Sequence, residues 1–201
     1  MADLLGRLVL RHLEHEDVDL RVDAQYDERV ARNIAGHLAL TPRDELLSRF
    51  REHVDDPASG RLEYVVAKPG GETVGYIFLT GLDWVNRTCD LSITMLPRFR
   101  TGLGYLALMC AFDYVYGCLN MHAVLTMVLD VNEMMASGEW NAKRANVTST
   151  QANYTDGAFR AVHVWTQTRP EYEAMIAEGR ARIAAMRERL GNGLGKEVGA
   201  R

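Results

Sequence analysis

The sequence predicts an α/β protein built on one sheet of mixed, mostly antiparallel direction, flanked by helices and followed by a C-terminal helix. Three observations lead to this class. Two strand-like runs meet at a Pro-Gly-Gly turn, residues 69–71, which is typical of an antiparallel hairpin. An apolar helix is indicated at residues 105–119, directly after a pair of glycines. A near-continuous apolar run at 123–131 then predicts a central strand that is covered on both faces.

The segment before the hairpin predicts one strand and two helical regions. Leucines that alternate over residues 8–13 indicate the strand. Residues 18–40 carry apolar side chains at helical spacing. The next helix is expected to open with Thr41 as its N-cap and Pro42 in the first helical position.

The segment after the hairpin predicts further strands and a last helix. A third antiparallel strand is expected at 88–96, whereas residues 134–157 show no clean period and predict an irregular segment. One more strand at 158–167 precedes a long helix with an apolar seam. We divide the chain into a domain at 1–168 and a C-terminal helical extension and tail at 169–201. The seam predicts docking onto the same domain or, second, a homodimer contact.

Composition excludes several classes of protein. The chain has 201 residues, of which 47% are hydrophobic and 25% are charged, as in ordinary globular domains. Its net charge of −4 argues against a nucleic-acid partner, because such domains carry a basic stripe. Neither a signal peptide nor a membrane-spanning run is recognisable, so we expect a cytoplasmic protein without a membrane partner.

The cysteines indicate neither a disulfide nor a metal site. Cys89, Cys110 and Cys118 lie in apolar surroundings and predict buried free thiols in a reducing compartment. Cysteine and histidine spacings do not match a metal-binding pattern, so we expect no metal.

The stretch RFRTGLGYLA, residues 98–107, predicts a phosphate-binding site. The first backbone N–H groups of a helix have no partner within the helix and carry partial positive charge. Gly102 and Gly104 would let a phosphate approach the backbone, and Arg98 and Arg100 can add charge-assisted hydrogen bonds. The alternative is a plain glycine turn with two solvated arginines.

Two phosphate-binding folds fit this stretch poorly. Residues 102–107 match the dinucleotide fingerprint G-x-G-x-x-G/A, but that fold needs its glycines directly after a strand and an acidic residue about 20 positions later. Here residues 97–101 intervene and Asp130 is too distant. A Walker A loop is excluded because no Gly-Lys-Ser/Thr follows.

Residues 75–133 resemble the GNAT superfamily of N-acetyltransferases. The runs NRTCDLSI, MLPRFRTGLGY, YGCLNMHAV and LDVNE agree with its motifs in order and spacing. The most similar branch contains the ribosomal-protein alanine N-acetyltransferases, and YTDGAFRAVHVW is similar to its late hairpin. The resemblance extends over residues 8–168. It implies a sheet whose central strands splay apart around acetyl-CoA, or another acyl-CoA, as co-substrate.

The resemblance also implies which residues bind the cofactor. The backbone groups of Met95 and Leu96 would pair with pantetheine like an added strand. Asn132 would bond to the pantetheine arm or near the thioester. The pyrophosphate would be held by Arg98 and by the backbone from Arg100 onward, that is Arg100, Thr101, Gly102, Leu103, Gly104 and Tyr105.

The implied chemistry is direct attack of a neutral amine on a thioester carbonyl. Asp90 matches the acidic position of the family and is the expected general base; the alternative is that it only pairs with Arg87 or caps a loop. A strand N–H near Met95 would stabilise the oxyanion. Residues expected to line the acceptor site are Tyr26, Trp84 and Trp140.

Two departures from the family pattern leave alternatives open. Phe99 occupies a position that is Gln or Arg in the family. The usual tyrosine general acid falls near Glu139, so either Glu139 is the acid, or Tyr154 reaches the site, or no acid is needed. We therefore expect a CoA-dependent N-acyltransferase, most simply an N-acetyltransferase, acting on a primary amine of a small molecule or a protein N-terminus. The alternative is a catalytically silent acyl-CoA sensor or interaction module.

Overall fold

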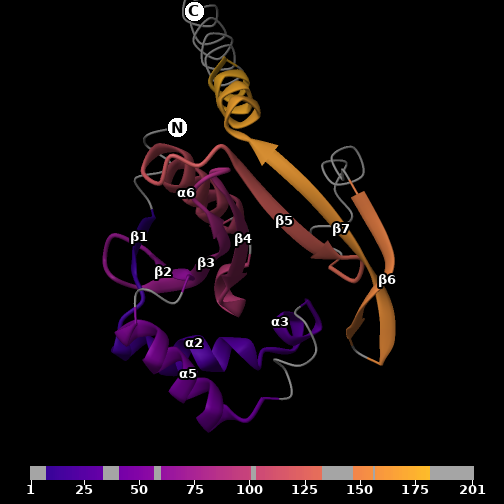
Figure 1. Cartoon of the computed structure of the whole chain (residues 1–201). Helices are drawn as coiled ribbons and strands as arrows, with labels where there is room; N and C mark the ends of the chain where they lie inside the picture. The colour runs from indigo at the N-terminus through magenta and orange to yellow at the C-terminus, as the bar shows by residue number, and fades with distance from the viewer. Residues whose placement is uncertain are drawn as a thin grey trace, which may run out of the picture.

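The computed structural model describes residues 8–33, 41–56, 60–100, 103–132, 147–155 and 157–181. Within them the chain forms a seven-stranded sheet in the order β1-β2-β3-β4-β5-β7-β6 (Figure 1). The strands are β1 (Val9–His12), β2 (Leu62–Ala67), β3 (Thr73–Asp83), β4 (Thr88–Met95), β5 (Ala123–Leu129), β6 (Val147–Thr155) and β7 (Ala158–Thr168). The helices are α2 (Val18–Gln25), α3 (Glu28–Asn33), α5 (Arg43–Asp55), α6 (Leu103–Gly117) and a C-terminal helix at 169–181, with short 3₁₀ turns at His15–Asp17 and Pro97–Phe99.

The centre of the sheet opens, as the fold class predicted. All described strand pairs are antiparallel except β4 and β5, which pair in parallel at only three positions, the last being Asp90 opposite Leu125. Beyond this point β4 stays with β3 and β5 stays with β7. The sheet therefore has two halves that diverge, and Figure 1 shows β5, β7 and β6 turning away as a separate arm.

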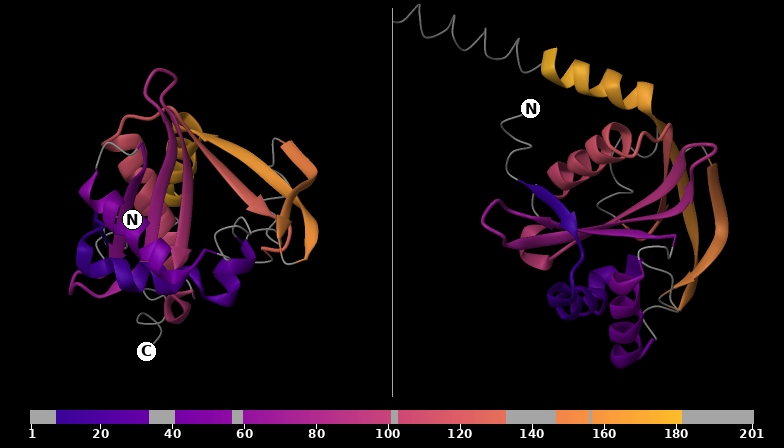
Figure 2. Two further views of the ribbon diagram at one scale, coloured as in Figure 1. Left: turned by 60° about the horizontal axis from the view of Figure 1, so that its bottom comes forward. Right: turned by 60° about the vertical axis from the view of Figure 1, so that its left-hand side comes forward.

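Helices cover both faces of the half formed by β1–β4. Helix α6 lies on one face, where Tyr64 of β2 and Tyr114 of α6 share a hydrogen bond of 2.8 Å between their hydroxyls. Helices α2 and α5 lie on the other face, where Arg21 of α2 forms a buried ion pair with Glu63 of β2. Figure 2 shows the two helical layers on opposite sides of the strands. Strands β2 and β3 are buried on both sides for this reason.

The N-terminal elements differ in detail from the prediction. The stretch predicted as helical over 18–40 is broken within its described part after Gln25, and a second helix begins at Glu28. Asp27 accepts hydrogen bonds from the N–H groups of Arg29 (3.1 Å) and Val30 (3.3 Å), which is how an aspartate starts a helix. Helix α5 has Pro42, not Thr41, at its N-cap, because Pro42 has an extended ψ of 146°.

The hairpin at residues 69–71 is confirmed by the antiparallel pairing of β2 with β3. The irregular segment predicted for 134–157 is wrong over its described part, because residues 147–155 form β6 against β7. These residues are polar, so the strand depends on its partner for backbone hydrogen bonds rather than on an apolar pattern. Strand β5 is central as predicted, but Met127 is 64% exposed, so the strand is not covered on both faces.

The C-terminal helix docks onto α6. Tyr172 is buried, its ring lies 5.5 Å from Phe112 and 5.2 Å from Tyr116, and its hydroxyl donates to Asp113 at 2.5 Å. Docking onto the same domain is thus confirmed for residues 169–181, and residues 182–201 lie outside the described ones. Within the described part of the chain, no helix has the length and apolar character needed to cross a membrane.

Candidate active site

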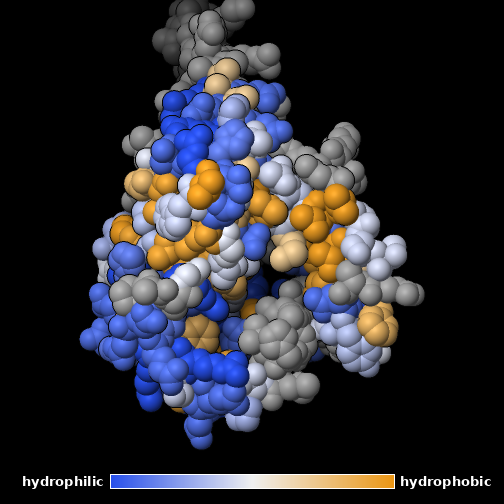
Figure 3. All heavy atoms as spheres, in the orientation of Figure 1, coloured by the Kyte–Doolittle hydropathy of each residue, from blue (hydrophilic) through white to orange (hydrophobic). Residues whose placement is uncertain are grey.

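The candidate site is the opening between β4 and β5. Figure 3 shows the surface hollowed between the helix-covered half of the molecule and the arm of β5, β7 and β6. The backbone of β4 borders this opening with alternate residues. Leu96 donates its N–H to Val74 of β3 at 3.0 Å, so the groups of Met95 and Ile93 face the opposite side, toward the opening. This alternation directs the backbone N–H and carbonyl of Met95 toward the opening, and their pairing with pantetheine stays a prediction.

Leu96 does not share this property. Its N–H is given to Val74, and its carbonyl accepts the N–H of Phe99 at 2.9 Å. Both backbone groups of Leu96 are thus used within the chain. Sequence alone could not show this, because the choice between the two strand edges depends on the register with β3.

Asp90 lies at the point where the two central strands part. It is opposite Leu125 in the last pair between β4 and β5, and opposite Thr80 of β3. Among the described residues, no hydrogen bond or ion pair reaches its carboxylate, so the alternative pairing with Arg87 is not formed. Burial raises the pKa of Asp90 above its ordinary value, because a low-dielectric surrounding disfavours the charged form. A half-buried, unpaired carboxylate of raised pKa is suited to accept a proton.

Gly81 is a residue of the site that sequence reasoning missed. The register of β3 and β4 shifts between Thr80 and Asp83, and Gly81 adopts a φ of 56° in this bulge. A Cβ at Gly81 would lie 2.8 Å from the Oδ2 atom of Asp90. The glycine thus provides both the backbone conformation and the space for the carboxylate. An isolated glycine within a strand pattern is the signal that could have indicated it.

The start of α6 lies next to the end of β4. Gly104, in the first turn of α6, has Met95 as its nearest neighbour, since an added Cβ would lie 3.6 Å from the side chain of Met95. The first-turn N–H groups of Leu103, Gly104 and Tyr105 point out of the helix and have no acceptor within it. Thr101 and Gly102, also predicted to bind pyrophosphate, lie outside the described residues.

The two arginines of the predicted phosphate loop are both engaged by carboxylates. Arg98 is 3.2 Å from Glu72, and Arg100 forms an ion pair with Asp27 in the turn between α2 and α3. The plain alternative of two solvated arginines is therefore wrong for Arg100, which is largely buried. Asp27 was not predicted as a site residue, because it lies far from Arg100 in the sequence.

Phe99 is a core residue. It is 8% exposed, and the cationic ends of Lys68 and Arg98 each lie 4.7 Å from the centre of its ring. Its own N–H belongs to the 3₁₀ turn Pro97–Phe99. The position where the family has Gln or Arg is thus filled by an aromatic side chain that packs inward and is stabilised by two cation–π contacts.

The predicted acceptor residues are not all close together. Tyr26, which follows α2, is 40% exposed and donates its hydroxyl to the carbonyl of Thr41 at 2.6 Å. Trp84 is 59% exposed in the turn before β4, at the end of the sheet where β4 and β5 still pair. It therefore lies at the closed end of the opening. Trp140 and Glu139 lie outside the described residues.

Asn132, predicted to contact acetyl-CoA, and Tyr154, one alternative for the general acid, each have partners within the chain. Asn132 follows β5 and donates its backbone N–H to Leu129 at 3.0 Å, which places it at the far end of the strand that borders the opening. Tyr154 lies on β6, in edge-to-face contact with Phe159 at 5.1 Å.

Cys89, the cysteine next to Asp90, does not provide a nucleophile. Cys89 is buried, and burial together with the neighbouring charge of Asp90 raises its pKa to about 11. A thiol of such pKa is inert at neutral pH. Cys110 is half-buried and Cys118 is exposed, so only Cys89 is fully buried as predicted, and all three are free thiols. Within the described residues, no group of histidine, cysteine and acidic side chains could hold a metal ion.

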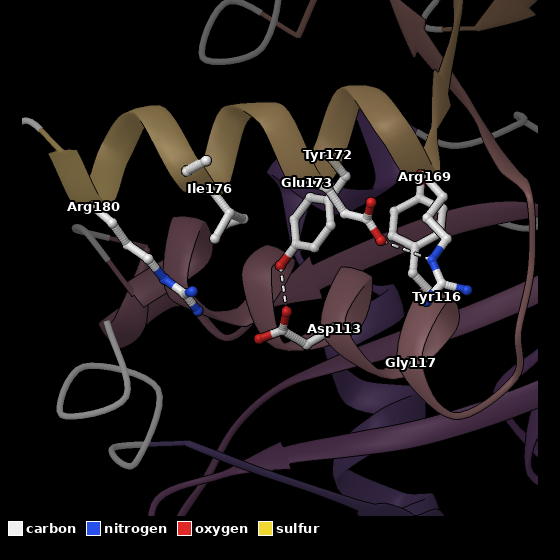
Figure 4. A pocket seen from close by; sticks show the side chains of 9 residues that line it. Asp113, Tyr116, Gly117, Arg169, Tyr172, Glu173, Ile176 and Arg180 are labelled. Carbon is white, nitrogen blue, oxygen red and sulfur yellow. Dashed lines mark hydrogen bonds and ion pairs between the residues drawn. The ribbon is translucent and has the colours of Figure 1, made fainter.

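A cavity of about 320 Å³ lies elsewhere, between α6 and the C-terminal helix (Figure 4). Two pairs of its polar side chains are bonded to each other: Tyr172 with Asp113, and Arg169 with Glu173 at 2.9 Å. It is part of the seam that docks the C-terminal helix and is separate from Asp90.

Comparison with known proteins gives both a family and a set of similar folds. A model of the acetyltransferase (GNAT) domain matches residues 7–137. No match was found among the curated proteins. Among solved structures, spermidine N-acetyltransferase from Vibrio cholerae in complex with CoA and spermine aligns with a TM-score of 0.73 and 17% identity, covering 83% of this chain and 98% of that one. A dodecameric form of the Vibrio cholerae enzyme aligns with a TM-score of 0.68 and 17% identity, covering 83% and 96%.

Proposed function

This chain belongs to the acetyltransferase (GNAT) domain family, and from that premise we propose that Asp90 is the base that deprotonates its acceptor amine. As a member of the family the chain is an N-acetyltransferase, and acetyl-CoA is its donor. The observation that carries the proposal is the place of Asp90. It is an unpaired carboxylate, among the described residues, at the point where β4 and β5 part.

The residues around the opening fit acetyl-CoA. The outward backbone groups of Met95 and Ile93 can pair with the amides of pantetheine as a neighbouring strand would. The N-terminal turn of α6, with Gly104 beside Met95, can receive the pyrophosphate. Arg98 adds a cation at this end, and Arg100 does so if a phosphate competes with Asp27 for its guanidinium.

The proposed transfer has one covalent step. The amine nitrogen attacks the thioester carbonyl, its proton passes to the carboxylate of Asp90 directly or through a water, and the C–N bond forms. The outward N–H of Met95 is available to the developing oxyanion. The C–S bond then breaks, and the thiolate of CoA takes up a proton. Glu139 and Tyr154 stay proposals for the acid of this last step.

The acceptor is proposed to be a small-molecule amine, with a protein N-terminus as the second candidate. The similar solved structures are named as spermidine N-acetyltransferases, which supports a small amine. The protein N-terminus follows from the resemblance to the ribosomal-protein alanine branch. A homodimer through the C-terminal helix and a cytoplasmic location also stay proposals.

The first experiment is thermal unfolding with acetyl-CoA, CoA and NADP, each in large excess. A ligand at about 100 times its dissociation constant adds about 2.7 kcal/mol, which is roughly 5–10 °C for a chain of this size. We expect a shift with acetyl-CoA and CoA and none with NADP. Release of free CoA is then measured with a panel of primary amines. Binding of acetyl-CoA without turnover on any amine would favour the silent sensor.

A further inference from the structure

We propose that the acceptor of this enzyme is a monoamine with an apolar body, and that this body packs on an exposed apolar strip beside Asp90. The inference rests on the proposed function, because it takes Asp90 as the base. The strip consists of Met127 on β5, Val164 on β7 and Val147 on β6. Met127 is paired with Val164, and Val164 is paired with Val147, so the three side chains form one row across three strands.

The strip lies on the same face of the sheet as the carboxylate of Asp90. Paired residues on neighbouring strands point to the same face, and so do residues two apart on one strand. Asp90 is opposite Leu125, and Met127 follows Leu125 by two residues. At about 3.3 Å per residue, Met127 lies about 7 Å further along β5. An amine held at Asp90 can therefore extend an apolar group onto the strip.

The strip is open to solvent. Met127 is 64% and Val147 is 58% exposed, and Val164 is half-buried. Helices α2 and α5 cover this face only over the other half of the sheet (Figure 2). Figure 3 shows hydrophobic atoms gathered on the arm of β5, β7 and β6, beside the central hollow. An exposed apolar row next to the proposed reaction site offers a surface that an apolar ligand can cover.

The charges on this face of the arm argue against a polycationic acceptor. By the same alternation, the described residues of β5, β6 and β7 on this face include no acidic side chain. Their one charged residue is Arg160, which is paired with Asn153 and points to the face of Val162 and Val164. A second or third ammonium group would meet a cation there and find no carboxylate.

The aspartates of α2 and of the turn after it already pair with arginines, so a second ammonium group would have to compete with a guanidinium for each of them. The ion pairs are Asp19 and Asp23 with Arg43, and Asp27 with Arg100. Asp90 alone, among the carboxylates described around the parting of β4 and β5, is left for one amine. One free carboxylate beside an apolar row fits one amino group on an apolar body.

The test measures kcat/KM for acetyl transfer to unbranched primary alkylamines of two to eight carbons at saturating acetyl-CoA, with spermidine for comparison. The basicity of the amino group changes little along this series. A change of kcat/KM with chain length therefore reports the contact of the alkyl chain with the strip. We expect kcat/KM to rise about two- to fourfold per methylene, the range between half and full burial of that group. Octylamine is expected to exceed spermidine.

Variants of the strip test whether the apolar body of the acceptor packs there. Met127→Gln keeps the length of the side chain at an exposed position, and we expect it to flatten the dependence of kcat/KM on the chain length of the amine. Val147→Thr on the strip is matched by Val85→Thr, the same change at a residue that is exposed in the turn before β4. We expect Val147→Thr to weaken the dependence of kcat/KM on chain length and Val85→Thr to leave it unchanged.

Each other outcome overturns the inference. If kcat/KM of the wild type does not change with chain length, or is higher for spermidine than for octylamine, the acceptor is not an apolar monoamine. The proposed acetyl transfer would still stand. If acetyl-CoA binds and no amine is acetylated, the proposed function fails and the inference fails with it. If Met127→Gln converts a dimer to a monomer in solution and leaves the chain-length dependence unchanged, the strip is a contact between copies.

Discussion

Asp90 is the residue on which the proposed chemistry depends. Asp90→Asn keeps the shape of the side chain and removes the base, so we expect kcat/KM to fall about 10²- to 10⁴-fold while acetyl-CoA still raises the unfolding temperature. Steady-state kinetics and thermal unfolding measure the two effects. Normal turnover by this variant would show that another group takes the proton.

The pH dependence of kcat/KM and of stability follows from the direction in which the pKa of Asp90 is shifted. Because the folded pKa of Asp90 is raised, kcat/KM should fall as pH falls through a value above that of an ordinary aspartate. The ionised carboxylate costs stability once the pH exceeds its unfolded pKa of about 3.9. Asp90→Asn should therefore be at least as stable as the wild type at pH 7, and the difference should vanish below about pH 4. Urea unfolding at both pH values checks this.

Gly81 is the residue that gives this carboxylate its space. Gly81→Ala places a Cβ 2.8 Å from Oδ2 of Asp90 at a φ of +56°, so we expect a loss of about 1–2 kcal/mol from the backbone conformation and a roughly 10- to 100-fold lower kcat from displacement of the carboxylate. Gly60→Ala is the matched control, because Gly60 has a φ of +70° and open space around it. It should lose similar stability and keep its kcat. Equal kcat values for the two variants would contradict the positioning role.

At the scale of elements, the loop between β4 and α6 is held by packing as much as by charge. Phe99→Gln restores the residue type of the family but removes a buried ring, so we expect a loss of about 2–4 kcal/mol and no tighter binding of CoA. Phe159→Gln, at a 65% exposed ring, is the control and should change stability by less than about 1 kcal/mol. Chemical denaturation and titration with CoA distinguish the two effects. Tighter CoA binding by Phe99→Gln would contradict the packing role. It would show that Phe99 occupies the place of a side chain that binds phosphate in the family.

The ion pair between Asp27 and Arg100 ties this loop to the turn between α2 and α3. Burial acts to raise the pKa of Asp27, but hydrogen bonds from Arg100 and from the N–H groups of Val30 and Arg29 outweigh it and lower that pKa. Asp27→Asn should therefore cost about 1–2 kcal/mol at pH 7. The cost should disappear as pH falls through the lowered pKa, below about pH 4. An unchanged free energy of unfolding at pH 7 would mean that the pair does not hold the two segments together.

The sequence predicted the elements whose signal is local, and it offered Asp90 as a site residue whose role stays a prediction. The β2–β3 hairpin has its own turn, and Asp90 lies in a motif of fixed spacing. Strand β6 was missed because its polar residues form a strand only against β7. The backbone pairing of Leu96, the ion pair of Arg100 and the place of Gly81 were not predicted, because each depends on a partner on another element: Val74, Asp27 and Asp90.

At the scale of the molecule, the chain is a sheet in two halves that acetyl-CoA is proposed to bridge. Backbone N–H groups of β4 alternate between β3 and the opening, so we expect the amides of Ile93 and Met95 to exchange with solvent faster than those of Ser92 and Thr94. Acetyl-CoA should slow the first pair and leave the second unchanged, which hydrogen exchange followed by NMR can resolve. Equal exchange at all four positions without ligand would contradict the free edge.

The short contact between β4 and β5 has a consequence for cooperativity. Three residue pairs join the halves of the sheet directly, whereas β3 and β4 are paired along most of their length. Regions with few mutual contacts open as separate units, at a free energy below that of global unfolding. The arm of β5, β7 and β6 is therefore expected to open before the helix-covered half does. Acetyl-CoA bound across the gap would couple the arm to the helix-covered half. The enzyme would therefore unfold in one cooperative transition only when acetyl-CoA is bound.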